Sequence, residues 1–214
     1  MIKACIFDLD GVIIDTAQYH FLAWQRLAQE LGIHFTKEHN ERLKGVSRTQ
    51  SLEILLELGG KSLDENSKAI LASRKNEWFV EYINKLKPED TYPGVKELLM
   101  KIRKKGMKVG LASSSKNART VISLIGIKDE FDAIVDGTMI SKTKPDPEIF
   151  LLAASKLQTS PSECIVFEDA EAGVEASLRA GMKTVGIGSP SQLGKANVVI
   201  PRTGDFDTSL LDSL

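Results

Sequence analysis

Short apolar runs alternating with amphipathic helical patterns limit the possible folds of this chain more than any other feature. Helical patterns such as VKELLMKIRKKG, which Pro93 opens and Gly106 closes, separate the apolar runs. The runs themselves read as buried strands: KACIFDLD, KVGLASSS, FDAIVDG, CIVFEDA, KTVGIGS and NVVIP. Because strands that alternate with helices pair in parallel and are covered on both faces, we predict an α/β fold built on a parallel sheet.

One segment, from residue 16 to about residue 87, breaks this alternation because it holds helical patterns and no convincing strand. AQYHFLAWQRLAQELG repeats its apolar residues at helical spacing. Ser47 and Gln50 form a possible capping box at the start of the next helical pattern. We therefore predict an all-helical cap domain over residues 16–87, inserted into a core domain of residues 1–15 and 88–214. Open α/β sheets bind ligands at the carboxyl ends of their strands, so we expect the cap above that edge.

Four of the predicted strand ends carry charged or hydroxyl side chains. The carboxyl ends of parallel strands lie at one edge of the sheet, so residues that end separate strands become neighbours. The four clusters are Asp8 with Asp10; Ser113, Ser114 and Ser115 followed by Lys116 and Asn117; Lys144; and Glu168 with Asp169. The sequence therefore predicts that these residues meet in one site.

The carboxylates of this predicted site need a cation between them. Asp8 and Asp10 are two residues apart and point the same way along an extended strand, so they repel each other. Oxygen ligands of this kind favour Mg²⁺. The serine hydroxyls and nearby N–H groups could hold phosphate oxygens, with Lys144 balancing the added negative charge. A carboxylate nucleophile, a metal, an anion cradle and a lysine together indicate phosphoryl transfer.

Each cluster taken alone has a simpler interpretation. The first pair of aspartates could form a solvated turn, the later acidic pair could cap a helix and interact with its dipole, and the serines could only cap a helix. The occurrence of all four clusters at strand ends favours the catalytic interpretation. Asp15 and Asp136 receive no role from the sequence.

The four clusters, in this order, resemble the motifs of the haloacid dehalogenase superfamily. The matching segments are DLDGV at 8–12, ASS at 112–114, the Lys144 region and ED at 168–169. The resemblance implies a Rossmann-like core in which Asp8 attacks phosphorus and becomes an aspartyl phosphate. It implies that Asp10 protonates the leaving oxygen and later deprotonates the acceptor. A dehalogenase would not need the second aspartate, so its presence favours phosphoryl transfer.

The same resemblance implies a metal site and two further catalytic residues. Mg²⁺ would be held by Asp8, by the main-chain carbonyl of Asp10 and by Asp169, with Glu168 beside it. Ser113 and Lys144 would complete the catalytic set. These assignments come from the family motifs and not from spacing alone.

A narrower resemblance, to the sugar-phosphate mutases of this superfamily, covers nearly the whole chain. It rests on DGVIIDTAQYHFLAW, LKGVSR, SRKN, LASSSKN, KPDPEIF and EDAEAG. It implies interconversion of β-D-glucose 1-phosphate and glucose 6-phosphate through a glucose 1,6-bisphosphate intermediate. His20 would pair with Lys44 to help hold Asp10, and Arg48 would grip the phosphate that is not reacting.

Further substrate-binding candidates follow from the same segments. They are Gly45, Val46, Ser114, Ser115, Lys116 and Asn117, together with Lys75 and Trp24. By pattern alone, Lys75 is a surface lysine, Trp24 is a core residue and His20 lies on the polar face of a helix. Trp24 lies one turn from His20 on the same helix face, which keeps it a candidate.

Two other functions fit parts of this pattern. A sugar-phosphate or phosphoglycolate phosphatase on the same fold would not need His20, Lys44 and Arg48 together. A non-catalytic sugar-phosphate sensor would not need the complete set of Asp8, Asp10, Lys144 and Asp169. We expect the mutase, with Mg²⁺ as cofactor and glucose 1,6-bisphosphate as activator and intermediate.

Composition and charge exclude several partner classes. The chain has 28 Lys and Arg against 29 Asp and Glu, a net charge of −1, so no global field attracts nucleic acid or an anionic membrane. Cys5 and Cys164 fall in predicted strands and are expected to be reduced structural thiols. The first apolar run is short and ends in acids, unlike a signal peptide, and no run reaches membrane-spanning length. We expect a cytoplasmic monomer that acts on a small sugar phosphate.

Overall fold

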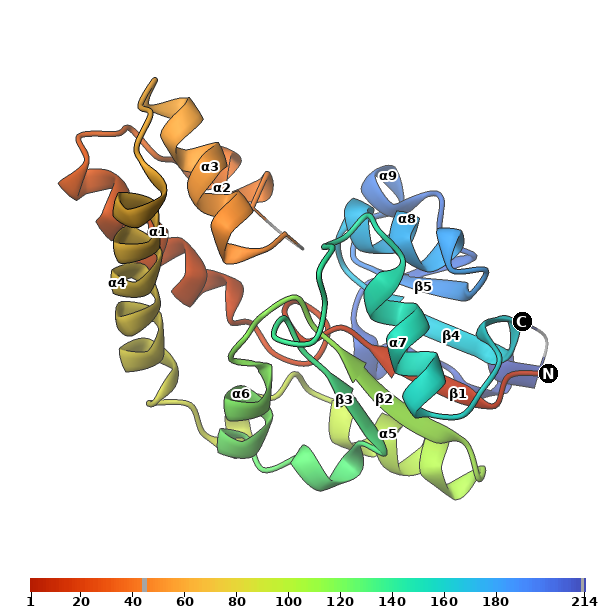
Figure 1. Ribbon diagram of the computed structural model, residues 1–214. Helices are drawn as coiled ribbons and strands as arrows, with labels where there is room; N and C mark the ends of the chain where they lie inside the picture. Colours follow the sequence, from red (N-terminus) through yellow and green to blue (C-terminus); the bar gives the residue numbers. More distant parts are fainter. Residues whose placement is uncertain (44–45, 213) are drawn as a thin grey trace. The chain divides into compact units, whose positions relative to one another are not determined.

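A six-stranded parallel sheet organises the larger part of the chain, as the computed structural model shows (Figure 1). The structure describes residues 1–43, 46–212 and 214. It divides into two units, which we call the α/β unit (Met1–Asp15 with Lys87–Leu214) and the helical unit (Thr16–Leu86).

The strands of the α/β unit lie in the order β3-β2-β1-β4-β5-β6, and every neighbouring pair is parallel. This arrangement confirms the predicted α/β fold with a parallel sheet. β1 lies near the middle of the sheet, with β2 and β4 on either side, so the residues that follow these three strands are neighbours. The strands are β1 (Ala4–Phe7), β2 (Lys108–Ala112), β3 (Ala133–Val135), β4 (Cys164–Glu168), β5 (Lys183–Ile187) and β6 (Val198–Ile200).

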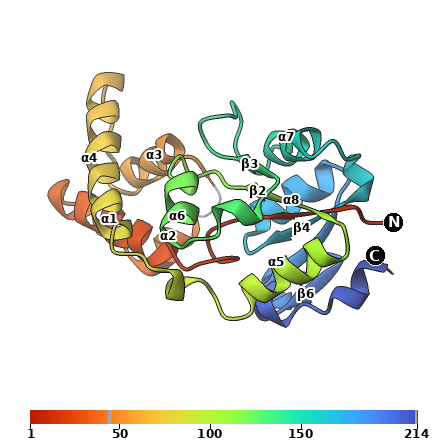
Figure 2. The ribbon, with the colours of Figure 1, turned by 90° about the horizontal axis from the view of Figure 1, so that it is seen from below.

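Helices cover both faces of this sheet (Figure 2). On one face α7 (Glu148–Lys156) packs on the first three strands and α8 (Glu171–Arg179) on β4 and β5, while α5 (Val95–Lys104) lies on the other face against β2. α5 buries an apolar stripe and keeps basic residues in its last turn, where the helix dipole favours cations. The remaining elements are α6 (Ala118–Leu124), α9 (Pro190–Leu193) and the 3₁₀ helices Pro88–Asp90, Lys128–Glu130, Pro161–Glu163, Thr203–Asp205 and Thr208–Asp212.

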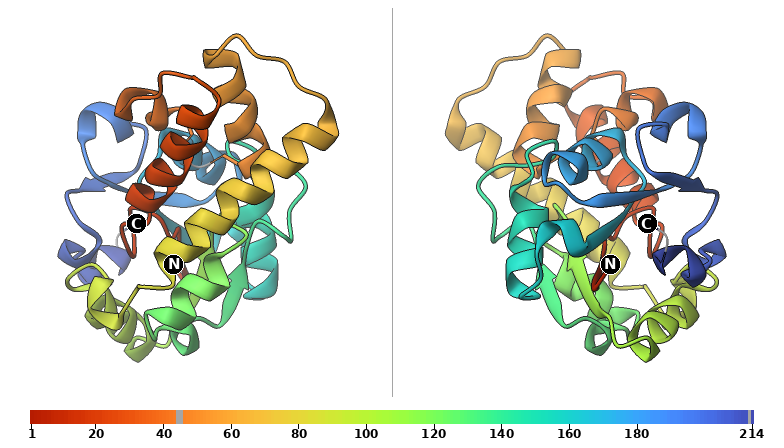
Figure 3. Two further views of the ribbon diagram at one scale, coloured as in Figure 1. Left: turned by 90° about the vertical axis from the view of Figure 1, so that its left-hand side faces the viewer. Right: turned by 90° about the vertical axis from the view of Figure 1, so that its right-hand side faces the viewer.

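The helical unit contains only helices among its described residues, as the sequence predicted. α1 and α4 pack against each other, and both helices can be followed in Figure 3 by their colours. Ser47 begins α3 by accepting a hydrogen bond from Gln50 N–H at 3.2 Å, which is one half of the capping box that the sequence suggested. The helices are α1 (Ala17–Glu30), α2 (Lys37–Glu41), α3 (Arg48–Leu58) and α4 (Glu65–Ile83).

A further expectation from the sequence is met by the two cysteines. Cys5 and Cys164 are free and buried in neighbouring strands, and burial raises the pKa of both thiols, so they remain protonated. Among the helices that the structure describes, none combines the length and the apolar character needed to cross a membrane.

The end of β1 is supported by the last part of the chain. The ring of Phe7 stacks on Phe167 of β4 at 4.4 Å, and Phe206 meets Phe167 edge-on at 4.9 Å. Thr203, which is 1% exposed, donates its hydroxyl to the carbonyl of Val12 at 2.6 Å. A hydrogen bond between residues 191 positions apart thus holds the loop that follows β1.

Thr203→Val should destabilise the α/β unit, because the buried carbonyl of Val12 would lose this hydrogen bond while the volume of the side chain stays nearly the same. We expect a loss of about 1–3 kcal/mol in the free energy of unfolding, measured by urea denaturation. Thr203→Ser keeps the hydroxyl and should lose less. Equal stability of Thr203→Val and wild type would contradict this role.

Candidate active site

Three carboxylates meet at the carboxyl edge of the sheet. Phe7 lies opposite Phe167 in the register of β1 and β4, so Asp8 emerges beside Glu168 and Asp169. One carboxylate oxygen from each of these three residues lies within 4.8 Å of the others. We call Asp8, Glu168 and Asp169 the acid cluster.

A buried lysine joins two members of the acid cluster. Nζ of Lys144 lies 2.5 Å from Oδ1 of Asp8 and 2.8 Å from Oε2 of Glu168, and the lysine is 1% exposed. Burial alone would lower the pKa of Lys144, but the carboxylates of Asp8 and Glu168 outweigh it and raise the pKa, so this side chain is a permanent cation.

One lysine does not neutralise three carboxylates. Burial raises the pKa of Glu168, against the opposing effect of Lys144 and with reinforcement from Asp8 and Asp169. Crowded oxygen donors of this kind suit a hard divalent cation, and a cation at this position would favour the ionised form of each carboxylate. The residues of the acid cluster therefore fit the Mg²⁺ that the sequence predicted.

Two glycines leave room for these carboxylates. Gly11 has φ +78°, and a Cβ there would lie 2.0 Å from Oδ2 of Asp169. A Cβ on Gly173, in α8, would lie 2.0 Å from Cδ of Glu168. Neither glycine has a role predicted from the sequence, although Gly11 lies in DLDGV and Gly173 lies in EDAEAG.

Asp10 lies in the loop after β1, and this loop is closed on itself. Gly11 N–H donates to the carbonyl of Ile14 at 2.9 Å, and Asp10 pairs with Ile14 in an isolated bridge. Burial and the negative charges of Asp15, Asp169 and Asp10 raise the pKa of Tyr92 to about 12. Tyr92 therefore stands close to the acids of this site, and the sequence analysis did not identify it.

The serines after β2 bond to their own loop. The hydroxyl of Ser113 accepts from Ser115 N–H at 3.1 Å, and the hydroxyl of Ser115 accepts from Asn117 N–H at 3.2 Å. Ser113 is 1% exposed, whereas Lys116 is exposed. The sequence left open that these serines cap a helix, but α6 begins after Asn117 without a side-chain cap, and the two hydroxyls bond to backbone N–H groups within the loop instead. We call Ser113–Asn117 the serine loop; β2 places it next to Asp8, because β2 pairs with β1.

The candidates in the helical unit form a cluster of their own. Nζ of Lys75 lies 2.8 Å from Nδ1 of His20 and 4.7 Å from the ring centre of Trp24. The ring of His20 stacks on Phe79 at 3.9 Å. Lys75 is 2% exposed, so the surface position that its pattern favoured is wrong.

These contacts change the protonation of His20. Burial, with help from the charges of Lys75 and Arg48, holds the pKa of His20 well below its usual value. Arg48 is the first residue of α3, and Val46 is partly exposed just before that helix. Lys44 and Gly45 lie outside the described residues, so the pairing of His20 with Lys44 stays a prediction.

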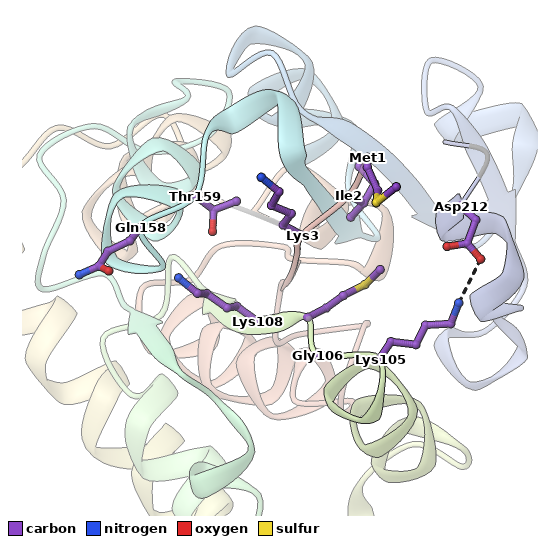
Figure 4. A pocket seen from close by; sticks show the side chains of 10 residues that line it. Met1, Ile2, Lys3, Lys105, Gly106, Lys108, Gln158, Thr159 and Asp212 are labelled. Carbon is purple, nitrogen blue, oxygen red and sulfur yellow. Dashed lines mark hydrogen bonds and ion pairs between the residues drawn. The ribbon is translucent and has the colours of Figure 1, made fainter.

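A hollow elsewhere in the α/β unit lacks such chemistry (Figure 4). It has a volume of about 440 Å³ and lies where β1 and β2 begin, at the edge of the sheet away from the acid cluster. Lys105 pairs there with Asp212 at 3.1 Å, and Lys108 donates to the carbonyl of Leu157 at 2.5 Å. Its lysines are thus engaged with the protein itself, and the carboxyl edge remains the candidate active site.

The parallel sheet and the acid cluster define a Rossmann-like α/β protein with a carboxylate-rich site at the carboxyl ends of β1 and β4. The family model described as haloacid dehalogenase-like hydrolase matches residues 5–187. The chain therefore belongs to the haloacid dehalogenase-like hydrolase family, as the four motifs predicted.

Within this family, the chain is similar to several individual proteins. The chain is 48% identical to β-phosphoglucomutase of Bacillus subtilis, over 98% of this chain and 93% of that protein. It is 35% identical to a phosphorylated carbohydrates phosphatase of Thermotoga maritima, over 86% of this chain and 83% of that protein. The crystal structure of β-phosphoglucomutase from Clostridium difficile has a TM-score of 0.97 and 43% identity, over all of this chain and 96% of that one.

Gly173→Ala should weaken Mg²⁺ binding, because the added methyl group would displace the carboxylate of Glu168. We expect an affinity about tenfold lower or more, measured by isothermal titration calorimetry. Ala172→Gly, at the preceding position of α8, is the control, because it changes the helix propensity of α8 without adding a methyl group against Glu168. It should leave the affinity for Mg²⁺ unchanged. An unchanged affinity in Gly173→Ala would show that Glu168 does not depend on this glycine.

Lys75→Met should raise the pKa of His20 but leave it below its usual value, because burial remains the main cause of the shift. The check is an NMR titration of the imidazole nitrogens, with Lys68→Met on the same helix as the control. Since unfolded chains protonate histidine near about pH 6.5, His20 should destabilise the wild-type fold as the pH falls below that value and have no effect above it. Titration of wild-type His20 near pH 6.5 would contradict its burial, and an unchanged pKa of His20 in Lys75→Met would contradict the effect of Lys75.

Proposed function

We propose that this protein acts as a β-phosphoglucomutase, interconverting β-D-glucose 1-phosphate and glucose 6-phosphate. The observation that carries the proposal is the near full-length similarity to proteins named β-phosphoglucomutase. The geometry supports it, because the buried Asp8 contacts the cation of Lys144 and lies beside two further carboxylates. Such an arrangement suits attack by a carboxylate on phosphorus.

The reaction would proceed in two transfers through Asp8. Phosphorylated Asp8 gives its phosphoryl group to the 6-hydroxyl of β-glucose 1-phosphate, while Asp10 accepts the hydroxyl proton, and glucose 1,6-bisphosphate forms. The bisphosphate then presents its other end. A carboxylate oxygen of Asp8 attacks the phosphorus on C1, the bond between phosphorus and the C1 oxygen breaks, and Asp10 returns the proton to that oxygen. Glucose 6-phosphate leaves, and Asp8 is phosphorylated again.

The charge of the transferring group needs positive partners. Lys144 supplies one, and its contact with Asp8 also fixes one oxygen of the nucleophile. Mg²⁺, held by Asp8, the Asp10 carbonyl and Asp169 with Glu168 beside it, would supply the remaining charge stabilisation. We assign the serine loop, with Ser113, Ser114, Ser115, Lys116 and Asn117, to binding the phosphate from the core.

We assign the second phosphate and the sugar to the helical unit, acting as the cap (residues 16–87) on the core (residues 1–15 and 88–214). Arg48 would bind the phosphate that is not reacting, with the segment Lys44, Gly45 and Val46 beside it in sequence. The cluster of His20, Lys75 and Trp24 would help to hold Asp10 and the sugar. A mutase must exclude water because water hydrolyses an aspartyl phosphate, and a cap serves that purpose.

The net charge of the chain bears on the class of partner that it suits. With a net charge of −1, the chain has no global field that would draw it to nucleic acid or to a membrane surface, and it suits a small sugar phosphate better. We propose a monomer that works in the cytoplasm.

A sugar-phosphate phosphatase is the second candidate, favoured by the similarity to the Thermotoga maritima phosphatase. The two functions share the acid cluster and differ in the fate of the phosphorylated aspartate. In a phosphatase, water takes the phosphoryl group; in a mutase, a second sugar phosphate takes it.

Turnover of β-glucose 1-phosphate with Mg²⁺ and a trace of glucose 1,6-bisphosphate separates these candidates. We expect glucose 6-phosphate to form without matching release of inorganic phosphate, both measured in one sample. Asp8→Asn should abolish turnover and keep the fold, because the amide cannot form the aspartyl phosphate. Phosphate release with little glucose 6-phosphate would establish the phosphatase, and appreciable turnover by Asp8→Asn would exclude Asp8 as the nucleophile.

A further inference from the structure

Asp136, at the end of β3, is a buried acid for which neither the sequence nor the proposed reaction has a use. It is 2% exposed, and both of its carboxylate oxygens are bonded. One oxygen accepts from Nε of Arg119 at 2.8 Å; the other accepts from Thr138 N–H at 2.9 Å and from the Thr138 hydroxyl at 2.5 Å. A buried carboxylate held in this way has a fixed position.

Arg119 links Asp136 to the helix that follows the serine loop. It is the second residue of α6, two positions after Asn117, which ends the loop. Its Nη2 donates to the carbonyl of Ile134 at 2.9 Å, so the guanidinium contacts both the backbone of β3 and the side chain of Asp136. The first turn of α6 is thereby fastened to the end of β3.

The backbone of β3 holds the other side of the serine loop. Ser113 N–H donates to the carbonyl of Val135 at 3.0 Å, and Gly137 N–H donates to the carbonyl of Ser115 at 3.3 Å. A Cβ on Gly137 would lie 2.2 Å from the carbonyl oxygen of Ser114. The segment Val135–Gly137 therefore contacts the serine loop from Ser113 to Lys116, and position 137 has no room for a side chain.

We propose that Asp136, through Arg119 and Gly137, is a positioning residue that sets the geometry of the serine loop for the transferring phosphoryl group. The inference rests on the proposed function, because it assigns the loop to phosphate binding. Asp136 does not touch the reacting atoms. Its effect is on orientation, where a displacement of about 1 Å can lower a rate about 100-fold.

The chain offers a matched pair for comparison. Arg103 donates to Asp132 at 3.1 Å and to the carbonyl of Glu130 at 3.0 Å, and Asp132 accepts from Val109 N–H at 2.8 Å. This second Arg–Asp pair also joins a helix to the β2–β3 region, but at the amino ends of the strands, away from the serine loop. Asp132→Asn therefore controls for the loss of a structural ion pair.

The experiment compares Asp136→Asn, Gly137→Ala and Asp132→Asn with the wild type. For each we would measure kcat and KM for β-glucose 1-phosphate, the affinity for beryllium trifluoride with Mg²⁺ by ¹⁹F NMR, and the unfolding midpoint in urea. We expect Asp136→Asn and Gly137→Ala to lower kcat about tenfold or more, to change KM much less, and to weaken beryllium trifluoride binding. Asp132→Asn should lose stability only. Gly137→Ala keeps the ion pair, so it tests the loop if Asp136→Asn does not fold.

The outcomes separate the inference from the function on which it rests. One outcome is that the wild type isomerises its substrate, while Asp136→Asn and Gly137→Ala have the same kcat and the same affinity for beryllium trifluoride as Asp132→Asn. In that case the positioning role is wrong and the mutase proposal stands. If wild type releases phosphate instead, weaker beryllium trifluoride binding in the loop variants still supports positioning while the mutase proposal fails. If wild type neither turns over substrate nor binds beryllium trifluoride, both are wrong.

Discussion

The contact of one buried lysine with two carboxylates is the constraint on which the active-site edge depends. Three acids gather where β1 and β4 end, and Lys144 is the cation that the structure places among them. Removing Lys144 would leave both of its buried carboxylate partners without this cation, and the loss of one partner of a buried ion pair destabilises by about 3–5 kcal/mol. The same arrangement leaves negative charge in excess, and this excess is what makes the site suitable for a divalent cation and for phosphoryl transfer.

The surrounding structure keeps these charged groups in place in two ways: packed side chains support the loop after β1, and glycines leave space for the carboxylates. Stacked rings and the bond from Thr203 to Val12 hold the loop after β1. Gly11 and Gly173 leave space that the carboxylates occupy. On the next strands, the ion pair of Asp136 and Arg119 fastens the serine loop. Residues that carry no chemistry of their own thus decide where the chemical groups stand.

The helical unit presents a different electrostatic situation. Its central group is Lys75, a buried lysine that contacts the imidazole of His20 and the rings of Trp24 and Phe79. Burial, together with the positive charges of Lys75 and Arg48, lowers the pKa of His20 and keeps its imidazole neutral. A buried positive charge of this kind attracts an anionic phosphate more strongly than an exposed one, because the protein interior screens charge less than water does.

Much of this protein can be read from its sequence, because the relevant information is local. The alternation of apolar runs and helical patterns is enough for the parallel sheet, and the position of each acid at a strand end is enough to bring Asp8 and Glu168 together, since parallel strands share one edge. Buried contacts between distant segments could not be read in this way. Lys75 looked like a surface residue, Asp136 had no role, and Gly173 was not singled out, because each depends on a partner that only folding brings near. The architecture and the chemical groups of the site thus follow from local patterns along the chain. The partners of those groups depend on the folded structure, since burial and contact are properties of the packed chain.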